Sequence, residues 1–150
     1  MRSGGGHAVW KRRKLTVEEC LRVSIIPFAR GGLLLPGASG QLTWTDPRTA
    51  QRTARANFRF ECTPDGGLLL RLVYNATSHA HSHAVDLPIP LTRTFPNFGG
   101  IRWWFTCPAV LDGMRCGRRV GTLYLPPDAK HFGCRICHNL TYRSRQRSRR

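Results

Sequence analysis

Four cysteines in the last third of the chain constrain its fold more than any other sequence feature. Cys134 and Cys137 form a C-x2-C pair, and Cys107 and Cys116 form a second pair with eight residues between them. Seventeen residues separate Cys116 from Cys134, which is enough for one β-hairpin. Two thiolate pairs at this spacing are a ligand set that tetrahedral Zn²⁺ prefers. The sequence therefore predicts one closed, structural zinc site of the zinc-ribbon type.

Local features around the cysteines support this prediction. Glycine follows Cys116, and a glycine there lets backbone N–H groups turn toward the sulfur. The hairpin between the pairs is expected to run through Val120–Leu125, turn at Pro126-Pro127-Asp128 and return through His131–Gly133. Two alternatives stay open: His138 replaces one of the cysteines, or the four cysteines are unrelated buried thiols.

The remaining cysteines and the N-terminus bear on where the protein works. The chain has six cysteines in all, and no apolar core of signal-peptide length follows its basic N-terminus. A disulfide framework is therefore not expected, because disulfides belong to oxidising compartments. Cys20 and Cys62 are interpreted as semi-buried thiols. No stretch approaches the ~20 apolar residues of a membrane-spanning helix, so we expect a cytoplasmic protein.

The chain is strongly basic, with 24 Lys and Arg residues against 8 Asp and Glu residues and a net charge of +16. The excess is densest in the last 50 residues, which hold 11 of the basic residues and only 2 of the acidic ones. Arginine dominates, and its planar guanidinium binds two phosphate oxygens at once. We therefore expect a nucleic acid partner, either DNA or RNA, and neither a membrane nor a small-molecule substrate.

Arginines and aromatic residues are interleaved around the cysteines. Aromatic rings stack on bases while arginines hold phosphates, a mixture that suits single strands or distorted duplexes. The arginines expected to bind nucleic acid are Arg118, Arg119, Arg135, Arg143, Arg145 and Arg147. The aromatic residues of this region are Trp103, Trp104, Phe105, Tyr124, Phe132 and Tyr142. Strand alternation places Trp103 and Phe105, or else Trp104, in the core.

The chain before the cysteines is predicted to be mainly antiparallel β. Arg55–Cys62 alternates apolar and polar residues most clearly. The turn Pro64-Asp65-Gly66-Gly67 joins it to the next strand. The predicted strands are Gln41–Thr45, Arg55–Cys62, Leu68–Tyr74, Val85–Leu91, Arg102–Thr106 and Val120–Leu125. Two prolines within Val85–Leu91 place that strand at a sheet edge.

Short helices are predicted near the N-terminus. Thr16-Val17-Glu18-Glu19 has the form of a capping box for a helix from about Val17. A second helical turn is expected after Ser24, ended by Gly31-Gly32. The predicted fold class is therefore α+β: a small, mainly antiparallel β domain with short N-terminal helices, followed by a C-terminal zinc ribbon. The predicted boundaries are a flexible basic arm at 1–15, the β domain at 16–100, the zinc-ribbon module at 101–143 and a disordered basic tail at 144–150.

Catalysis is not expected, because the eight acidic residues are scattered and mostly lie at caps and turns. No serine or cysteine sits in a nucleophile-elbow motif. His79, His81 and His83 alternate, and in a strand they would share a face that could bind a second metal. The neighbouring Asn, Ser and Thr residues favour a polar loop instead.

Several motifs carry a family resemblance: PNFGGIRWWFTCP at 96–108, CGRRV at 116–120, LYLPP at 123–127 and FGCRICHNLTYRS at 132–144. GLLLPGASGQLTW at 32–44 and the glycines before Trp10 add to it. In these motifs the chain resembles a group of small, uncharacterised bacterial and prophage-type proteins. The resemblance implies a zinc-ribbon-like set of four cysteines and no particular activity. Ala109–Arg115 makes a longer loop here than the short knuckle usual in that group.

These features together predict a non-enzymatic zinc-ribbon protein that binds nucleic acid in an accessory or regulatory role. One alternative is a protein-interaction module that docks on a larger phage or nucleic-acid-processing complex. A small enzyme such as a nuclease is the third hypothesis.

Overall fold

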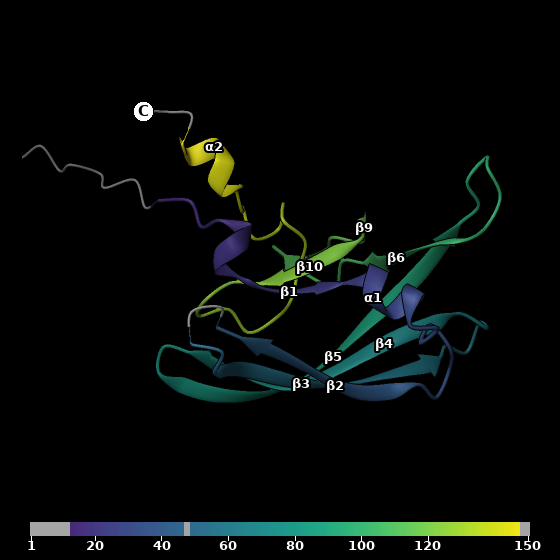
Figure 1. Cartoon of the computed structure of the whole chain (residues 1–150), viewed down its shortest axis with the longest axis horizontal. Helices are drawn as coiled ribbons and strands as arrows, with labels where there is room; N and C mark the ends of the chain where they lie inside the picture. The colour runs from purple at the N-terminus through teal and green to yellow at the C-terminus, as the bar shows by residue number, and fades with distance from the viewer. Residues whose placement is uncertain (1–12, 47–48, 148–150) are drawn as a thin grey trace, which may run out of the picture.

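Long antiparallel strands dominate the computed structural model, which describes residues 13–46 and 49–147 (Figure 1). The strands are β1 (Leu21–Ser24), β2 (Ser39–Thr45), β3 (Arg52–Cys62), β4 (Leu68–Ser78), β5 (His81–Thr94), β6 (Arg102–Thr106), β7 (Val110–Leu111), β8 (Met114–Arg115), β9 (Arg119–Val120) and β10 (Thr122–Leu125). The helical elements are a 3-10 turn (Val17–Glu19), α1 (Ile25–Arg30) and α2 (Arg143–Arg147).

Six of the strands form one antiparallel sheet in the order β2-β3-β4-β5-β6-β9. The pairs β1–β10 and β7–β8 form two small sheets. Strand β5 connects the two parts of the large sheet. Its first part, His81–Pro90, pairs with β4, and its last part, Leu91–Thr94, pairs with β6. The sheet therefore curls, and β6, β9, β10 and β1 lie over the half formed by β2, β3 and β4 (Figure 1).

The hydrophobic core fills the space between these two layers. Strand β4 buries every second side chain, so the period-two pattern of the sequence becomes an inner and an outer face. Phe60 of β3 and Leu72 of β4 are fully buried, and Phe105 of β6 and Leu123 of β10 close the core from the opposite layer. Phe28 of α1 packs edge-on against the aromatic rings of β3 and closes one end.

Helix α1 forms where the sequence predicts the second helical turn. The Ser24 hydroxyl accepts a hydrogen bond from the Ile26 N–H at 3.4 Å and so caps the first turn. The helix ends at Arg30, and Gly32 follows with a φ of 68°, a left-handed conformation that glycine adopts without steric cost.

The predicted α+β class is wrong, because the described chain is mostly antiparallel β with only two short α-helices, of which α2 lies near the C-terminus. The helix predicted from Val17 is a single 3-10 turn. The Thr16 hydroxyl does not cap it and instead donates to the Glu19 carboxylate at 3.0 Å. The next residues, Leu21–Ser24, form a strand because pairing with β10 satisfies their backbone N–H and C=O groups.

The predicted strands are all present. Val120–Leu125 is divided at Gly121, so that β9 belongs to the large sheet whereas β10 pairs with β1. Pro88 and Pro90 lie in the part of β5 that pairs with β4 but not with β6. The other edge of this part is unpaired among the described strands, as the two prolines predict. Strands on both sides of residue 100 thus share one sheet, because β6 and β9 of the predicted zinc-ribbon segment continue the sheet that β2–β5 form.

The ends of the chain are only partly described. Residues 1–12 of the predicted arm and 148–150 of the predicted tail lie outside the described residues, and α2 covers 143–147. Arg13 pairs with Glu19 at 2.8 Å. No helix in the described part of the chain is long and apolar enough to cross a membrane.

Candidate metal centre

The fold brings Cys107, Cys116, Cys134 and Cys137 together although they come from three separate segments. Cys107 directly follows β6, Cys116 directly follows β8, and the other two lie in the turns after β10. Their four Sγ atoms all lie within 4.8 Å of one another. Within the described residues this is the one group of three or more His, Cys, Asp or Glu side chains that could hold a metal ion.

The spacing of the sulfur atoms matches a tetrahedral metal site. The Sγ atoms of Cys107 and Cys137 are 3.9 Å apart, and those of Cys116 and Cys134 are 3.8 Å apart. Four thiolates held at about 2.3 Å from a central Zn²⁺ would stand about 3.8 Å from one another, which is the edge length of that tetrahedron. All four cysteines are free of disulfide bonds. They could therefore coordinate one metal ion.

Backbone N–H groups point at the sulfurs, as they do in metal-binding knuckles. The Cys134 N–H donates to Cys107 Sγ at 3.2 Å, and the Cys137 N–H donates to Cys134 Sγ at 3.5 Å. Such hydrogen bonds stabilise the thiolate form and fix the direction in which each sulfur points.

The first cysteine pair is joined by a hairpin rather than by a short knuckle. The Cys107 N–H donates to the Arg118 carbonyl at 2.8 Å, and the Cys116 N–H donates to the Ala109 carbonyl at 2.8 Å. Strands β7 and β8 extend this ladder outward to a turn at Asp112-Gly113, where both residues have positive φ. The long loop seen in the sequence thus projects away from the sulfurs, and it leaves the two cysteines at its base side by side.

The protonation of the four thiols is coupled to metal binding, because a bound cation must replace their protons. Burial raises the pKa of Cys107 to about 11. Burial also acts to raise the pKa of Cys134, but hydrogen bonds from the Cys137 N–H and the neighbouring thiols outweigh it and lower this pKa to about 7. Burial and the adjacent thiols raise the pKa of Cys137 well above its usual range. Clustered thiolates repel one another, so a dication that replaces their protons relieves that repulsion.

His138, the alternative ligand, lies beside the cluster and is engaged elsewhere. Its Nε2 atom is 3.1 Å from the His131 carbonyl oxygen, and burial lowers its pKa. The ring packs over Gly133, where an added Cβ would lie 2.9 Å from Nε2 of His138 and 3.2 Å from Cβ of Ala109. Gly133 is therefore needed so that the second knuckle can approach the first.

The hypothesis that His79, His81 and His83 bind a second metal from one strand face is not supported, because His79 lies in a turn. His79 and Ala80 have φ values of 51° and 65° and form the tight connection between β4 and β5. Only His81 and His83 lie in a strand, so the three imidazoles do not share one strand face.

The predicted arginines occupy three different surroundings. The Arg118 guanidinium is 3.9 Å from Cys116 Sγ, and Arg119 lies on the edge strand β9, opposite Thr106. Arg135 donates to the Leu140 carbonyl at 3.3 Å, and its guanidinium lies over the Tyr142 ring, 5.5 Å from the centroid. Arg143 and Arg145 lie in α2, and the side chain of Arg147 is outside the described residues.

The aromatic residues divide between core and surface. Phe105 and Phe132 are fully buried and Trp103 packs against the core, which confirms the first of the two alternation hypotheses. Trp104 lies on the opposite face of β6, where its indole N–H donates to the Thr94 hydroxyl at 2.9 Å and the Arg102 guanidinium lies 4.1 Å from its ring centroid.

The sequence did not predict that Arg22, in the N-terminal strand β1, lies beside the aromatic and basic residues near the cysteine cluster. Arg22 of β1 lies directly opposite Tyr124 of β10, so the two side chains share one face of the small sheet. Burial raises the pKa of the Tyr124 phenol, and the charge of Tyr142 adds to this effect, whereas Arg22 and Arg135 oppose it. No local signal could reveal this cluster, because about a hundred residues separate the paired strands β1 and β10.

Fold and site together define a small antiparallel β protein with a four-cysteine cluster able to bind a metal ion. Comparison of the chain with protein-family models, with curated proteins and with solved structures finds no match. The resemblance to bacterial and prophage-type proteins therefore gains no support from these comparisons, and the cysteine cluster rests on its own geometry.

Proposed function

We propose that the protein is a zinc-stabilised, non-catalytic protein that binds nucleic acid. Zinc is the metal we favour because four thiolates in a tetrahedron are its usual structural ligand set. Protein side chains fill all four positions, so no position is left for a substrate or a reactive water. The ion would hold the end of β6, the base of the β7–β8 hairpin and the turns after β10 in one place.

The observation that carries the nucleic-acid proposal is a group of arginine and tyrosine side chains around Tyr124, which we call the arginine–tyrosine face: Arg22, Tyr124, Arg135 and Tyr142. Arg22 and Tyr124 are opposite each other on β1 and β10, and Arg135 stacks on Tyr142. Guanidinium groups bind phosphate and phenol rings stack on bases, so this combination fits a single strand. Arg143 and Arg145 in α2 follow Tyr142 in the chain and add two basic residues next to the arginine–tyrosine face.

Arg59 and Arg71 of the large sheet form ion pairs with carboxylates, whereas the arginines of this face form none with a described residue. On the outer side of the large sheet, Glu61 accepts hydrogen bonds from Arg59 and Arg71 at 2.9 and 3.0 Å, and Asp86 accepts from Arg71 at 2.7 Å. Among the described residues, no carboxylate forms an ion pair with Arg22 or Arg135. The excess charge of the arginine–tyrosine face is thus available to a polyanion.

The test is the salt dependence of binding to labelled single-stranded DNA, duplex DNA and RNA by the full-length, metal-loaded protein. For a single strand, the slope of log K against log salt becomes shallower by about 0.7 for each phosphate that the protein no longer neutralises. We expect Arg22→Ala with Arg135→Ala to make it shallower by about 1.4, twice that amount. Arg59→Ala, which removes an ion-paired arginine from the other layer, is the matched control.

Two results would count against the proposal. Equal slopes for the Arg22→Ala/Arg135→Ala variant, the Arg59→Ala variant and the unaltered protein would mean that the charge acts without a defined face. Binding without measurable salt dependence would exclude a phosphate-binding surface altogether. Metal content is measured for each variant, so that an emptied metal centre is not mistaken for a missing phosphate-binding group.

A further inference from the structure

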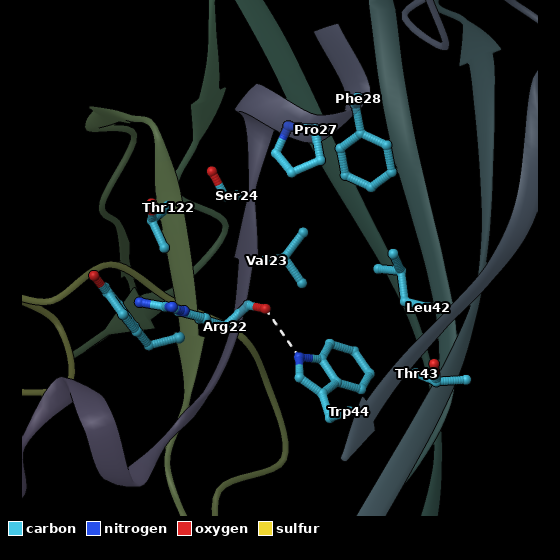
Figure 2. A pocket seen from close by; sticks show the side chains of 10 residues that line it. Arg22, Val23, Ser24, Pro27, Phe28, Leu42, Thr43, Trp44 and Thr122 are labelled. Atoms are coloured by element: carbon cyan, nitrogen blue, oxygen red, sulfur yellow. Dashed lines mark hydrogen bonds between the residues drawn. The ribbon is translucent and has the colours of Figure 1, made fainter. Parts of the chain in front are cut away.

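A cavity of about 500 Å³ lies between β1 and α1 on one side and β2 on the other (Figure 2). Its walls are apolar: Val23 and Phe28 come from the first side, and Leu42 and Trp44 come from β2. Its rim carries polar and charged groups, of which Arg22 and Tyr124 also belong to the arginine–tyrosine face. The volume falls within the range of about 300–1,000 Å³ that is usual for small-ligand sites.

The cavity exists because two strand edges face each other without pairing. Among the described strands, β1 pairs with β10 alone and β2 pairs with β3 alone. The Trp44 side chain spans the gap, and its indole N–H donates to the Arg22 carbonyl at 2.9 Å (Figure 2). A peptide that bound by adding a strand to the edge of β1 would need this carbonyl as a hydrogen-bond acceptor. Because Trp44 already occupies it, the contact disfavours peptide binding of that kind.

The orientation of the Trp44 ring depends on the metal knuckle. Trp44 stacks on Phe132 with centroids 6.1 Å apart and an angle of 27° between the ring planes. Phe132 is buried and stands two residues before Cys134, and Gly133 between them exchanges hydrogen bonds with Tyr124 at 2.8 and 3.0 Å. The knuckle therefore holds both the ring at the cavity wall and the tyrosine at its rim.

We propose that this cavity accepts one unstacked base of a single-stranded nucleic acid whose phosphates bind the arginine–tyrosine face. A base is a flat aromatic ring with a polar edge. The ring suits the walls formed by Phe28, Leu42 and Trp44, whose side chains border the cavity (Figure 2). Arg22 at the rim is placed for the adjoining phosphate. This inference rests on the proposed function and adds to it the site that takes the base.

The experiment compares a fully abasic DNA strand with the same strand carrying one adenine at its centre. Both carry the same charge, so the ratio of their dissociation constants reports the base alone. We expect the unaltered protein to prefer the adenine strand by about tenfold, the usual order for one stacked base. Leu42→Trp, which fills the cavity, should abolish this preference without changing the salt slope, whereas the volume-conserving Leu42→Ile should keep it. Trp44→Leu, which removes the stacking surface, is the second loss variant.

The outcomes separate this inference from the proposed function. A preference that persists in both Leu42→Trp and Trp44→Leu would overturn it, because the base would then stack elsewhere. Equal binding of the two strands by the unaltered protein, with a steep salt slope, would overturn the cavity site and leave the phosphate-binding face standing. Absence of salt-dependent binding to either strand would reject both.

Discussion

Tyr124 of β10 and Gly133 of the second knuckle exchange two backbone hydrogen bonds, with N···O distances of 2.8 and 3.0 Å. This pair of bonds joins the candidate metal centre to the small sheet that carries Arg22 and Tyr124 of the arginine–tyrosine face. It places Cys134 one residue beyond the bridge and Arg135 two residues beyond it. The conformation of the second knuckle and the position of the arginine–tyrosine face are therefore coupled through β10.

Removing one sulfur should empty the metal site and unfold the C-terminal region. We expect Cys134→Ser to lose its bound metal and at least about 4 kcal/mol of unfolding free energy, since loss of a structural metal is among the largest single-residue effects. The control is Cys62→Ser, because Cys62 is exposed and lies outside the cluster. Elemental analysis and denaturant titration measure the two effects. A folded Cys134→Ser protein with one metal ion per chain would show that these sulfurs are not its ligands.

Gly133 should tolerate no side chain, because a Cβ there would lie 2.9 Å from Nε2 of His138 and 3.2 Å from Cβ of Ala109. We expect Gly133→Ala to reduce the unfolding free energy by about 1–3 kcal/mol, as overpacking usually does. Gly121→Ala is the matched control, since an added Cβ there meets no heavy atom within 4 Å. Denaturant titration of metal-loaded proteins measures the difference, and equal stability of the two variants would contradict the packing of this knuckle.

Arg118 and Arg119 are neighbours in sequence and should differ in function. The Arg118 guanidinium, 3.9 Å from Cys116 Sγ, offsets the negative charge of the thiolates, so Arg118→Ala should weaken metal affinity by about 10-fold or more, as removal of a supporting group usually does. Arg119 lies on β9 opposite Thr106 and makes no ion pair with a described carboxylate, so Arg119→Ala should leave metal affinity unchanged. Competition with a chromophoric chelator measures both, and equal affinities would remove Arg118 from the metal centre.

The stability of the large sheet should fall in acid through Glu61. Hydrogen bonds from Arg71 and then Arg59 lower the pKa of this carboxyl group. A lowered pKa in the folded state means that the unfolded state binds more protons in acid. The contribution of Glu61 is therefore fully present above the unfolded pKa of about 4.3, and it is lost as the pH falls through the folded value.

The measurement is the unfolding free energy of Glu61→Gln and of the unaltered protein as a function of pH. We expect the variant to be less stable at neutral pH and the difference to shrink below a pH of about 4.3. Acid release of the metal affects both proteins alike and cancels in that difference. Asp112→Asn serves as the control, because Asp112 sits in the β7–β8 turn and makes no ion pair with a described residue. A pH-independent difference for Glu61→Gln would contradict the assignment.

Local sequence patterns were sufficient wherever neighbours in the chain decide the structure. The strand Arg102–Thr106 has the predicted bounds, and α1 begins after Ser24 as predicted. The alternation that begins at Arg55 separates core from surface as far as Phe60, whereas Cys62, predicted to be semi-buried, is exposed. Turn chemistry and a period of two residues act over a few residues, so they can be read from one segment. The same holds for the C-x2-C pair, whose two sulfurs lie on one tight turn.

Local sequence patterns predicted the wrong secondary structure where pairing with a distant segment determines it. Thr16-Val17-Glu18-Glu19 has the form of a capping box, yet the hydroxyl of Thr16 bonds to the carboxylate of Glu19 and only a 3-10 turn forms. The segment after it becomes a strand because β10, about a hundred residues later, supplies its hydrogen-bonding partner. No local propensity encodes that pairing, and the α+β prediction was wrong for this reason.

The sequence alone thus determined the four cysteines, their spacing and the excess of positive charge, because these are properties of composition and order. The tertiary structure decided that four sulfurs from three segments meet within 4.8 Å, that Arg22 lies opposite Tyr124, and that Trp44 closes the gap between two strand edges. Each of these contacts forms only when the curled sheet brings distant residues together, so burial and long-range pairing, not local propensity, create them.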